Sequence, residues 1–360
     1  MRQSTSNRSP VRILLYEWCC SGGLASRSPG DDFEGIVREG RMMLEALAAD
    51  AVRAAKIDVT VLVDDAISLS LPAEAHIQPV PRGGEVDALV TAAVAHDWTV
   101  IVAPETDGIL ASRVAATRDA GAAVLAPSAA FIAIASDKQA TVNALAAAGV
   151  PVPAGRSLAP GETVPVGFHM PAVRKDRSSV GCDGVQIIRD PNVATAPRAT
   201  RLEAFVAGMP VGVSCLCGPG RIDVLPPMRQ RFTVGDAPRY VGSDLFDEPR
   251  LARRAEALAR RAVAGIERAA GGEAAAGWIG VDLMLGERAD GRDDRVLEVN
   301  PRITTSFVGH AAGLSGSLVR AMLDVAAGDT QAIFTGGRPR PHPFRLSADA
   351  HPRSHGSRGP

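Results

Sequence analysis

Aromatic residues, cysteines and long apolar runs are all scarce in this sequence. Only 4% of its 360 residues are aromatic, and its five cysteines are an odd set without paired C-x-x-C spacing. Such a set indicates neither a disulfide framework nor a structural zinc site. No apolar run approaches the roughly 20 residues that a membrane-spanning helix needs. We therefore expect a cytoplasmic protein that makes no contact with a membrane.

An excess of charge of one sign is also missing. The 39 Lys and Arg residues are balanced by 40 Asp and Glu residues, which gives a formal net charge of −1. A chain without a basic field lacks the electrostatic footprint of nucleic-acid binding, so we expect small-molecule partners. A composition of 46% hydrophobic and 22% charged residues is ordinary for a globular protein with two or three domains.

Strands alternate with helices in the amino-terminal part of the sequence. Runs of β-branched and apolar residues predict strands at 11–18, 57–64, 98–105 and 121–127, and a helical pattern surrounds residues 39–49. Strands that alternate with helices are typical of an open parallel sheet, whose ligands gather at the carboxyl ends of its strands. The first strand is not followed by G-x-G-x-x-G, which argues against a Rossmann dehydrogenase.

Three residues lie at the carboxyl ends of these predicted strands: Gly22, Gly23 and Glu105. Their position makes the glycine pair a candidate substrate contact. A pair of glycines can equally serve only to form a tight turn.

The remaining sequence predicts an α+β region. A helix is expected from Ser136 or Asp137, either of which can cap it, to Gly149, and an amphipathic helix at 248–271. Short strands between glycine turns predict antiparallel pairing. These strands are expected at 170–176, 184–188, 201–208, 211–216, 278–285 and 295–300.

Two acids and an amide lie on two of these strands, between apolar neighbours. Glu298 and Asn300 are two positions apart and share one face, and Asp282 lies on the preceding strand. If the two strands are neighbours, the three side chains meet. Mg²⁺ prefers such hard oxygen ligands and often completes its coordination with nucleotide phosphates. Each residue could instead be a local cap or a member of a salt bridge.

Two lysines could supply the positive charge that phosphates need. Lys138 lies at the start of a helix, where backbone N–H groups favour anions. Lys175 ends a strand and precedes a turn that contains Ser178, Ser179 and Gly181, whose backbone N–H groups could cover phosphates. Either lysine alone could also be an ordinary surface residue.

In order and spacing, these motifs resemble the ATP-grasp carboxylate-amine ligases. The resemblance covers residues 11–325 and rests on "SDKQAT", the lysine strand with its turn, "EAFVAG", "GVDLML" and "LEVNPRITTS". Its specific part is an acid, one further residue and then Asn-Pro-Arg, at 298–302. The stretches "YEWCCSGGL" and "NPRITTSFVG" are most similar to the tyramine-glutamate ligases of methanofuran biosynthesis and their bacterial relatives in one-carbon metabolism.

The resemblance implies an α/β protein with the ATP-grasp fold, in which an amino-terminal open parallel α/β domain precedes two lobes that clasp ATP. The expected segments are a disordered leader at 1–10, the amino-terminal domain at 11–130, the central lobe at 131–206, the carboxy-terminal lobe at 207–335 and a disordered tail at 336–360. The tail is rich in Pro, Gly, Arg and His, a composition typical of disorder.

The resemblance also implies roles for single residues around ATP and Mg²⁺ or Mn²⁺. Lys138 and Lys175 would bind phosphates, and Arg302 would contact the transferred phosphoryl group or the acyl phosphate. The metal ligands would be Asp282, Glu298 and Asn300, and the adenine-side hinge would be Glu203, Phe205 and Val206. Asp176 departs from the family, since many relatives have proline and a glycine pair after the lysine. We expect it to turn away or to pair with Arg174 or Arg177.

For the substrates, the resemblance implies the γ-carboxyl of L-glutamate and tyramine or a tyrosine-like amine, with a homodimer as an open option. Arg229 and Arg231 would hold amino-acid carboxylates by forked hydrogen bonds, and Ser306 would contact substrate. An aromatic amine would need a wall, for which Trp18, Phe232 and Tyr240 are the candidates. The alternatives are another amino-acid ligase, such as a dipeptide or D-alanine:D-alanine type, and a nucleotide-binding regulatory protein without ligase activity.

Overall fold

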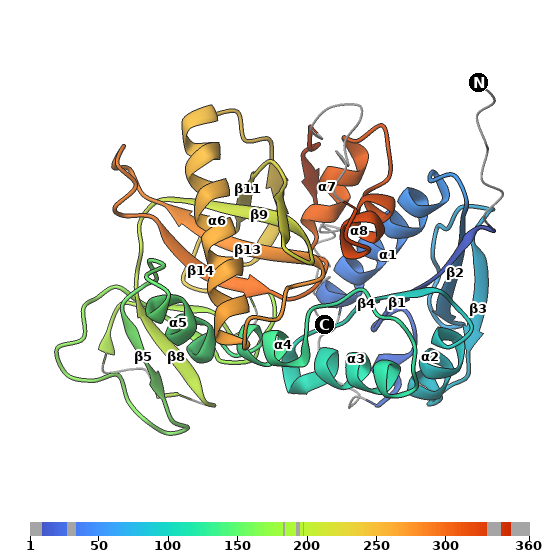
Figure 1. The fold of residues 1–360 in the computed structure, drawn as a ribbon. Helices are drawn as coiled ribbons and strands as arrows, with labels where there is room; N and C mark the ends of the chain where they lie inside the picture. The colour runs from blue at the N-terminus through green and yellow to red at the C-terminus, as the bar shows by residue number, and fades with distance from the viewer. Residues whose placement is uncertain are drawn as a thin grey trace, which may run out of the picture.

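The computed structural model describes residues 9–26, 34–182, 184–191, 195–196, 198–329 and 340–346, which form three β-sheets with helices packed on them (Figure 1). The predicted leader lies mostly outside these ranges, as do residues 336–339 and 347–360 of the predicted tail. Within the described ranges, no helix is both long and apolar enough to cross a membrane.

The amino-terminal domain is an open parallel sheet, as predicted. Its strand order is β3 (His76–Val80), β2 (Ile57–Asp64), β1 (Val11–Glu17) and β4 (Trp98–Val102). Strand β3 was not predicted. The predicted strand at 121–127 is wrong, because that segment contributes only one bridge, between Val124 and Thr99.

Helices cover both faces of this sheet, which a parallel sheet of apolar strands requires. Along β1, Ile13 and Leu15 pack toward α1 (Glu34–Val52), whereas Leu14 and Tyr16 pack on the opposite face. That opposite face is covered by α2 (Glu85–Ala93) and α3 (Ile109–Asp119), and two short 3-10 helices, η1 (Gly23–Ser26) and η2 (Thr106–Gly108), follow strand ends.

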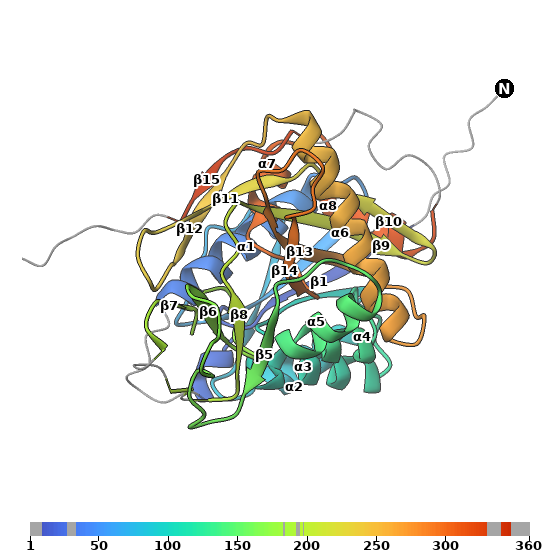
Figure 2. The same ribbon diagram turned by 90° about the vertical axis from the view of Figure 1, so that its left-hand side faces the viewer.

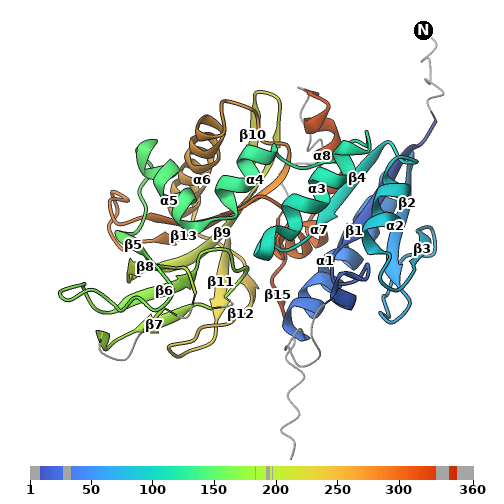
Figure 3. The ribbon, with the colours of Figure 1, turned by 90° about the horizontal axis from the view of Figure 1, so that it is seen from below.

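The small sheet is antiparallel and has its own core. Its strand order is β5 (Gly155–Leu158), β8 (Thr200–Ala204), β6 (Ala172–Asp176) and β7 (Gln186–Ile188). Leu158, Ala172 and Leu202 are buried in this core. Because the core is separate, the sheet forms a distinct unit beside the rest of the molecule (Figure 3).

The large sheet runs in the order β14, β13, β9, β11, β12, β15, with β10 paired to β9. Its strands are β9 (Met209–Gly218), β10 (Arg221–Val224), β11 (Met228–Phe232), β12 (Tyr240–Asp244), β13 (Gly277–Leu285), β14 (Arg295–Asn300) and β15 (Phe344–Arg345). Helix α6 (Pro249–Ala269) packs on one face through Ala255, Leu258 and Ile266, as its amphipathic pattern predicts.

Helices α4 (Ala129–Ala135) and α5 (Lys138–Ala147) contact α6 and share the core of the large sheet. We had assigned most of this segment to the central lobe at 131–206. The structure differs because Phe131 and Leu145 bury their apolar side chains against the large sheet and α6, not against the small sheet. Helix α5 begins as predicted, with the Asp137 side chain accepting hydrogen bonds from two backbone N–H groups.

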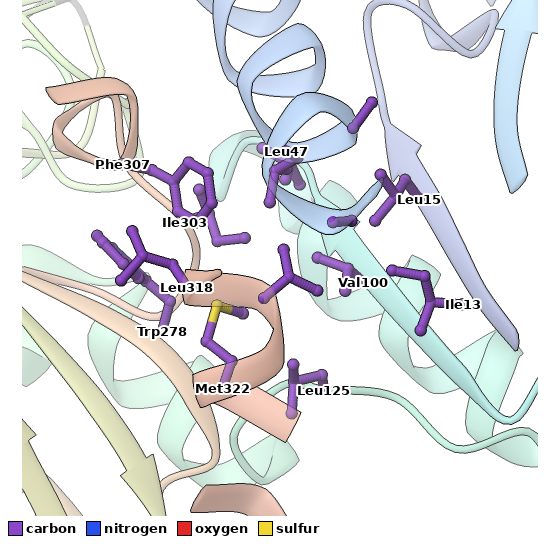
Figure 4. Packing of buried hydrophobic residues seen from close by; sticks show 14 of the residues in the cluster. Ile13, Leu15, Leu47, Val100, Leu125, Trp278, Ile303, Phe307, Leu318 and Met322 are labelled. Carbon is purple, nitrogen blue, oxygen red and sulfur yellow. The ribbon is translucent and has the colours of Figure 1, made fainter. Parts of the chain in front are cut away.

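Helices α7 (Ser306–Ala312) and α8 (Leu318–Ala326) join the large sheet to the amino-terminal domain. Figure 4 shows Phe307, Leu318 and Met322 in one cluster with Trp278 of β13 and Leu47 of α1. One continuous apolar core therefore fixes the amino-terminal domain against the large sheet.

Residues 340–346, which we call the carboxy-terminal segment, are ordered against the large sheet. Strand β15 pairs antiparallel with β12 at the sheet edge (Figure 2). The prediction of a disordered tail from residue 336 is thus wrong for these residues. The prediction rested on local composition, whereas the contacts that hold the segment come from strands and helices distant in the sequence.

Candidate active site

A cavity of about 1900 Å³ lies where the three sheets and α1 meet. Its walls include residues from β1, α1, β6, β8, β11, β12, β13 and β14. Most of the residues predicted to carry chemistry border it or support residues that do.

The predicted metal ligands meet on β13 and β14. Asp282 pairs in register with Glu298, and Asn300 Nδ2 donates to Asp282 Oδ2 over 3.0 Å. Gln230 on β11, which sequence reasoning missed, donates to Asp282 Oδ1 over 2.7 Å. It reaches across β9 at Gly212, where a Cβ would lie 3.3 Å from the Gln230 amide nitrogen. The three predicted ligands line the cavity.

These oxygens fit a divalent cation. Burial, together with the neighbouring charge of Glu298, raises the pKa of Asp282 to about 6. Asp282 accepts from two neutral amides, and the Lys138 ammonium pairs with Glu298, so two close carboxylates share one paired cation. They hold excess negative charge that a divalent cation would neutralise. Among the described residues no group of three His, Cys, Asp or Glu side chains could hold a metal, so the set rests on two acids and one amide.

Lys138 contacts this region without lining the cavity. Its Nζ lies 3.0 Å from Glu298 Oε1 and donates to the Ser179 carbonyl over 2.5 Å. Its side chain is only 4% exposed, so the ammonium links the metal region to the Gly/Ser turn from within the protein. In this structure the lysine holds the turn and one acid, and its contact with phosphate stays a prediction.

Lys175 borders the cavity on the hinge side, where a buried ion-pair network surrounds Glu203. Glu203 accepts from Lys175 Nζ at 2.8 Å and from Arg201 Nε at 2.7 Å. Burial alone would raise the pKa of Glu203, but the two cations hold it below its usual range. Burial alone would lower the pKa of Lys175, and the Glu203 carboxylate raises it instead. Phe205 and Val206 continue along the cavity wall.

In the Gly/Ser turn, Gly181 lines the cavity, whereas Ser178 and Ser179 do not; Ser179 holds Lys138 through its carbonyl. Asp176 does line the cavity, and it pairs with neither arginine that we expected. Arg174 binds the Thr195 carbonyl and Gln186, and Arg177 pairs with Asp137. The arginine near Asp176 is Arg198, at 3.9 Å.

Arg302 lines the cavity and is held by the amino-terminal domain. Its Nε donates to Glu105 Oε2 over 3.0 Å, and its Nη1 donates to the Ile303 carbonyl. Burial alone would lower the pKa of Arg302, but the charges of Glu105 and Glu39 raise it. A fixed guanidinium of this kind can stabilise negative charge at a constant position.

Two acids beside Arg302, one buried and one half-buried, escaped sequence reasoning. Glu17 ends β1, is 3% exposed and lines the cavity, and burial raises its pKa to about 7. Glu39 on α1 also lines the cavity. A signal was present in Gly40, a glycine inside a helix, where a Cβ would lie 2.6 Å from the Glu17 carboxylate.

Four predicted substrate contacts lie elsewhere. Along β11, Gln230 faces the cavity, so its neighbours Arg229 and Arg231 point to the other face, where Arg231 pairs with Asp244. Gly22 and Gly23 do not line the cavity either; added Cβ atoms there would meet side chains of the amino-terminal domain itself. Their glycine pair forms a turn.

Ser306 and the predicted aromatic wall do border the cavity. Ser306 Oγ lies 2.9 Å from Ser214 Oγ and 2.8 Å from Thr304 Oγ1. Trp18, Phe232 and Tyr240 all contribute to the lining. The rings of Phe232 and Tyr240 make an edge contact at 5.8 Å.

Family comparisons agree with this architecture. Residues 135–306 match the family model described as the ATP-grasp domain, and residues 57–132 match the pre ATP-grasp 3 domain. A comparison with curated protein sequences gave no match.

Solved structures share the fold at low sequence identity. An ATP-grasp superfamily protein from Archaeoglobus fulgidus aligns with a TM-score of 0.63 and 21% identity over 88% of each chain. N5-carboxyaminoimidazole ribonucleotide synthetase from Thermus thermophilus gives 0.62 and 18% over 92% of this chain and 81% of its own. L-amino acid ligase from Bacillus licheniformis gives 0.58 and 16% over 90% and 77%. The protein therefore has the ATP-grasp fold.

Proposed function

We propose that the protein is an ATP-dependent carboxylate-amine ligase, which forms an amide bond through an acyl phosphate and releases ADP and phosphate. The observation that carries the proposal is the convergence of Asp282, Glu298, Asn300, Lys175 and Arg302 on one cavity of an ATP-grasp fold. A regulatory protein that only bound a nucleotide would not require all five.

In this reaction a substrate carboxylate attacks the γ-phosphorus of ATP, and the amine then displaces phosphate from the acyl carbon. Lys175 and the N–H groups of the turn around Gly181 would hold phosphate oxygens, and Arg302 would stabilise charge on the transferred group. Asp282, Glu298 and Asn300 would hold Mg²⁺ or Mn²⁺, which neutralises phosphate oxygens when bound. No protein nucleophile is required.

For the substrates we propose the γ-carboxyl of L-glutamate and tyramine or a tyrosine-like amine. Trp18, Phe232 and Tyr240 in the lining support an aromatic amine. Because Arg229 and Arg231 point away, we assign the α-carboxylate contact to Arg38 instead. It lines the cavity, and its buried Nε has no hydrogen-bond partner in the described part of the chain.

The test is ADP release by the purified protein with ATP and Mg²⁺, Mn²⁺ or EDTA across a panel of amino acids and amines, with mass spectrometry of the products. A product equal to glutamate plus tyramine less water establishes the reaction and both substrates. Turnover with two amino acids instead identifies a dipeptide or D-alanine:D-alanine type of ligase. ATP binding without turnover anywhere in the panel contradicts the ligase proposal and favours a regulatory protein.

We further propose that the protein acts in the cytoplasm on these small molecules, without nucleic-acid or membrane partners. A homodimer remains part of this proposal, and light scattering of the purified protein measures the oligomeric state directly.

A further inference from the structure

Three glycines accommodate the backbone of the carboxy-terminal segment. A Cβ on Gly313 would lie 1.7 Å from the Arg340 carbonyl oxygen, and one on Gly309 would lie 2.6 Å from that of His342. A Cβ on Gly242 would lie 2.2 Å from the carbonyl oxygen of Phe344. Because these carbonyls belong to alternate residues, one edge of the extended segment is seated on glycines along its length.

Backbone hydrogen bonds hold the segment in this position. The His342 N–H donates to the Gly309 carbonyl over 2.8 Å, and the Leu346 N–H donates to the Val241 carbonyl over 3.1 Å. Between these two contacts, β15 pairs with β12. Residues 340–342 are therefore bound to α7 and the glycine that follows it, and residues 344–346 are bound to β12.

The segment ends in the cavity wall. Leu346 is 7% exposed and lines the cavity beside Tyr240 and Ser243 of β12. The Phe344 ring meets the Tyr240 ring at a centroid distance of 6.5 Å. In the large sheet β15 lies at the opposite edge from β14, which carries Glu298 and Asn300. This wall is thus separate from the predicted metal ligands.

We propose that the carboxy-terminal segment is a specificity-determining wall, in which Leu346 limits the size of the amine substrate and contacts its apolar or aromatic body. The segment takes no part in nucleotide binding. This inference rests on the proposed function, because it assigns one part of the same cavity to the amine.

The first experiment displaces the segment in the full chain. Gly313 has φ −96°, so Gly313→Ala introduces a methyl group without backbone strain and forces the Arg340 carbonyl away. Gly316→Ala is the matched control, because a Cβ there comes within 4 Å of no other described residue. We expect amide hydrogen exchange at His342 and Leu346 to accelerate roughly tenfold or more in Gly313→Ala only. Unchanged exchange in that variant overturns the docking.

The second experiment reads selectivity from ADP release with tyramine and with ethylamine. Removing buried methyl groups from an apolar pocket is worth on the order of tenfold or more, so Leu346→Ala should raise KM for tyramine by about that factor. We expect KM for ATP to change by less than about twofold, because Leu346 lies apart from the nucleotide contacts. Equal changes in both constants, or an unchanged preference for tyramine over ethylamine, overturn the proposal.

Failure of the proposed function gives a different result. If the wild-type protein releases no ADP with any acid and amine, the ligase assignment fails. The ATP affinity of Gly313→Ala then tests whether the carboxy-terminal segment is separate from the nucleotide site. Faster exchange in Gly313→Ala with unchanged ATP affinity still separates the wall from the nucleotide site. A loss of ATP affinity when the segment is displaced contradicts it.

Discussion

The two sides of the cavity use buried carboxylates in opposite ways. On the hinge side, Glu203 is held by the cations of Lys175 and Arg201, and its pKa is lowered. On the metal side, Asp282 accepts hydrogen bonds from two neutral amides and lies near Glu298, and its pKa is raised to about 6. On the hinge side two cations compensate one carboxylate, whereas on the metal side only the Lys138 ammonium pairs with the two carboxylates, at Glu298, so excess negative charge remains.

This difference distinguishes a carboxylate that stabilises the fold from a carboxylate that is available to bind a cationic ligand. A buried carboxylate without a cation is costly, and a fold retains it where a ligand supplies the missing positive charge. A buried carboxylate with two cations is already compensated, and its removal harms the fold itself. Substitutions on the two sides should therefore differ in which property they change.

The largest effect on stability is expected for Glu203→Gln. It leaves Lys175 and Arg201 buried without their carboxylate, which should cost about 3–5 kcal/mol in the free energy of unfolding. Urea denaturation measures this. Glu162→Gln is the control on the same side, because its pair with Arg156 is largely exposed and worth at most about 1 kcal/mol. Equal losses of unfolding free energy in both variants would contradict the proposal that Glu203 compensates the buried charges of Lys175 and Arg201.

Arg302→Ala should lower turnover by roughly two to three orders of magnitude, since it removes one fixed charge stabiliser. ATP affinity should stay mostly intact. Kinetics and ATP titration measure the two quantities, and Arg288→Ala, at an exposed arginine paired with Asp290, is the control. Near-normal turnover would remove Arg302 from the mechanism.

Glu17 extends the comparison to the pH dependence of stability. Its folded pKa of about 7 lies above the ordinary value of 4.5, so the folded state keeps the proton longer than the unfolded state. Wild-type stability should therefore fall as pH rises from 4.5 through 7, by up to about 3 kcal/mol at about 1.4 kcal/mol per pKa unit. Glu17→Gln keeps an acceptor for the Cys20 N–H without the charge.

The measurement is urea denaturation of both proteins at several pH values across this window. The stability of Glu17→Gln relative to wild type should increase steadily with pH. A constant difference would mean that Glu17 is not the group responsible.

Asp282→Asn should show the opposite pattern to Glu203→Gln. The Mg²⁺-dependent part of ATP affinity should fall about tenfold to a hundredfold, because one anionic ligand is lost. The free energy of unfolding should change by about 1 kcal/mol or less, since one hydrogen bond is exchanged for relief of a buried charge. ATP titrations with Mg²⁺ and with EDTA test this, and an unchanged Mg²⁺ dependence would exclude Asp282 as a ligand.

Local sequence patterns predicted the elements whose apolar periodicity is strong. Strands β1 and β2 and helix α6 follow those patterns closely. Strand β3 was not predicted because it is an edge strand that contains Pro79. Most of its residues are exposed, so its sequence does not alternate between apolar and polar residues. The segment at 121–127 is apolar because Val124 and Leu125 are buried, although the segment makes only one bridge.

A site residue could be predicted from sequence only where the pattern indicates which side chains of its strand face the cavity. Glu298 and Asn300 share a face by spacing alone, and the register with Asp282 follows from adjacent strands. On β11 the side chains alternate in the same way, but nothing local indicates that Gln230 is the inward residue and Arg229 and Arg231 are outward. Glu39 was missed because only tertiary packing brings α1 to the cavity.

The smallest effect is expected at Asp50, a buried acid outside the cavity. Its pKa is also raised by burial, yet Oδ2 accepts from Ser317 Oγ at 2.7 Å and from the Val319 N–H at 2.8 Å, at the start of α8. Asp50→Asn should therefore cost about 1 kcal/mol of stability, as for a weakened helix cap, and leave Mg²⁺-dependent ATP affinity unchanged.

Together with Asp282→Asn, this variant tests whether burial alone marks a functional acid. Desolvation raises the pKa of both carboxyls, but Asp50 also pairs with Arg53 and caps a helix. If Asp50→Asn weakened Mg²⁺-dependent binding as strongly as Asp282→Asn, the contact between α1 and α8 would have to be coupled to the metal side. If it does not, the deciding property of Asp282 is that, among the described residues, neutral amides and not a cation donate to its carboxylate.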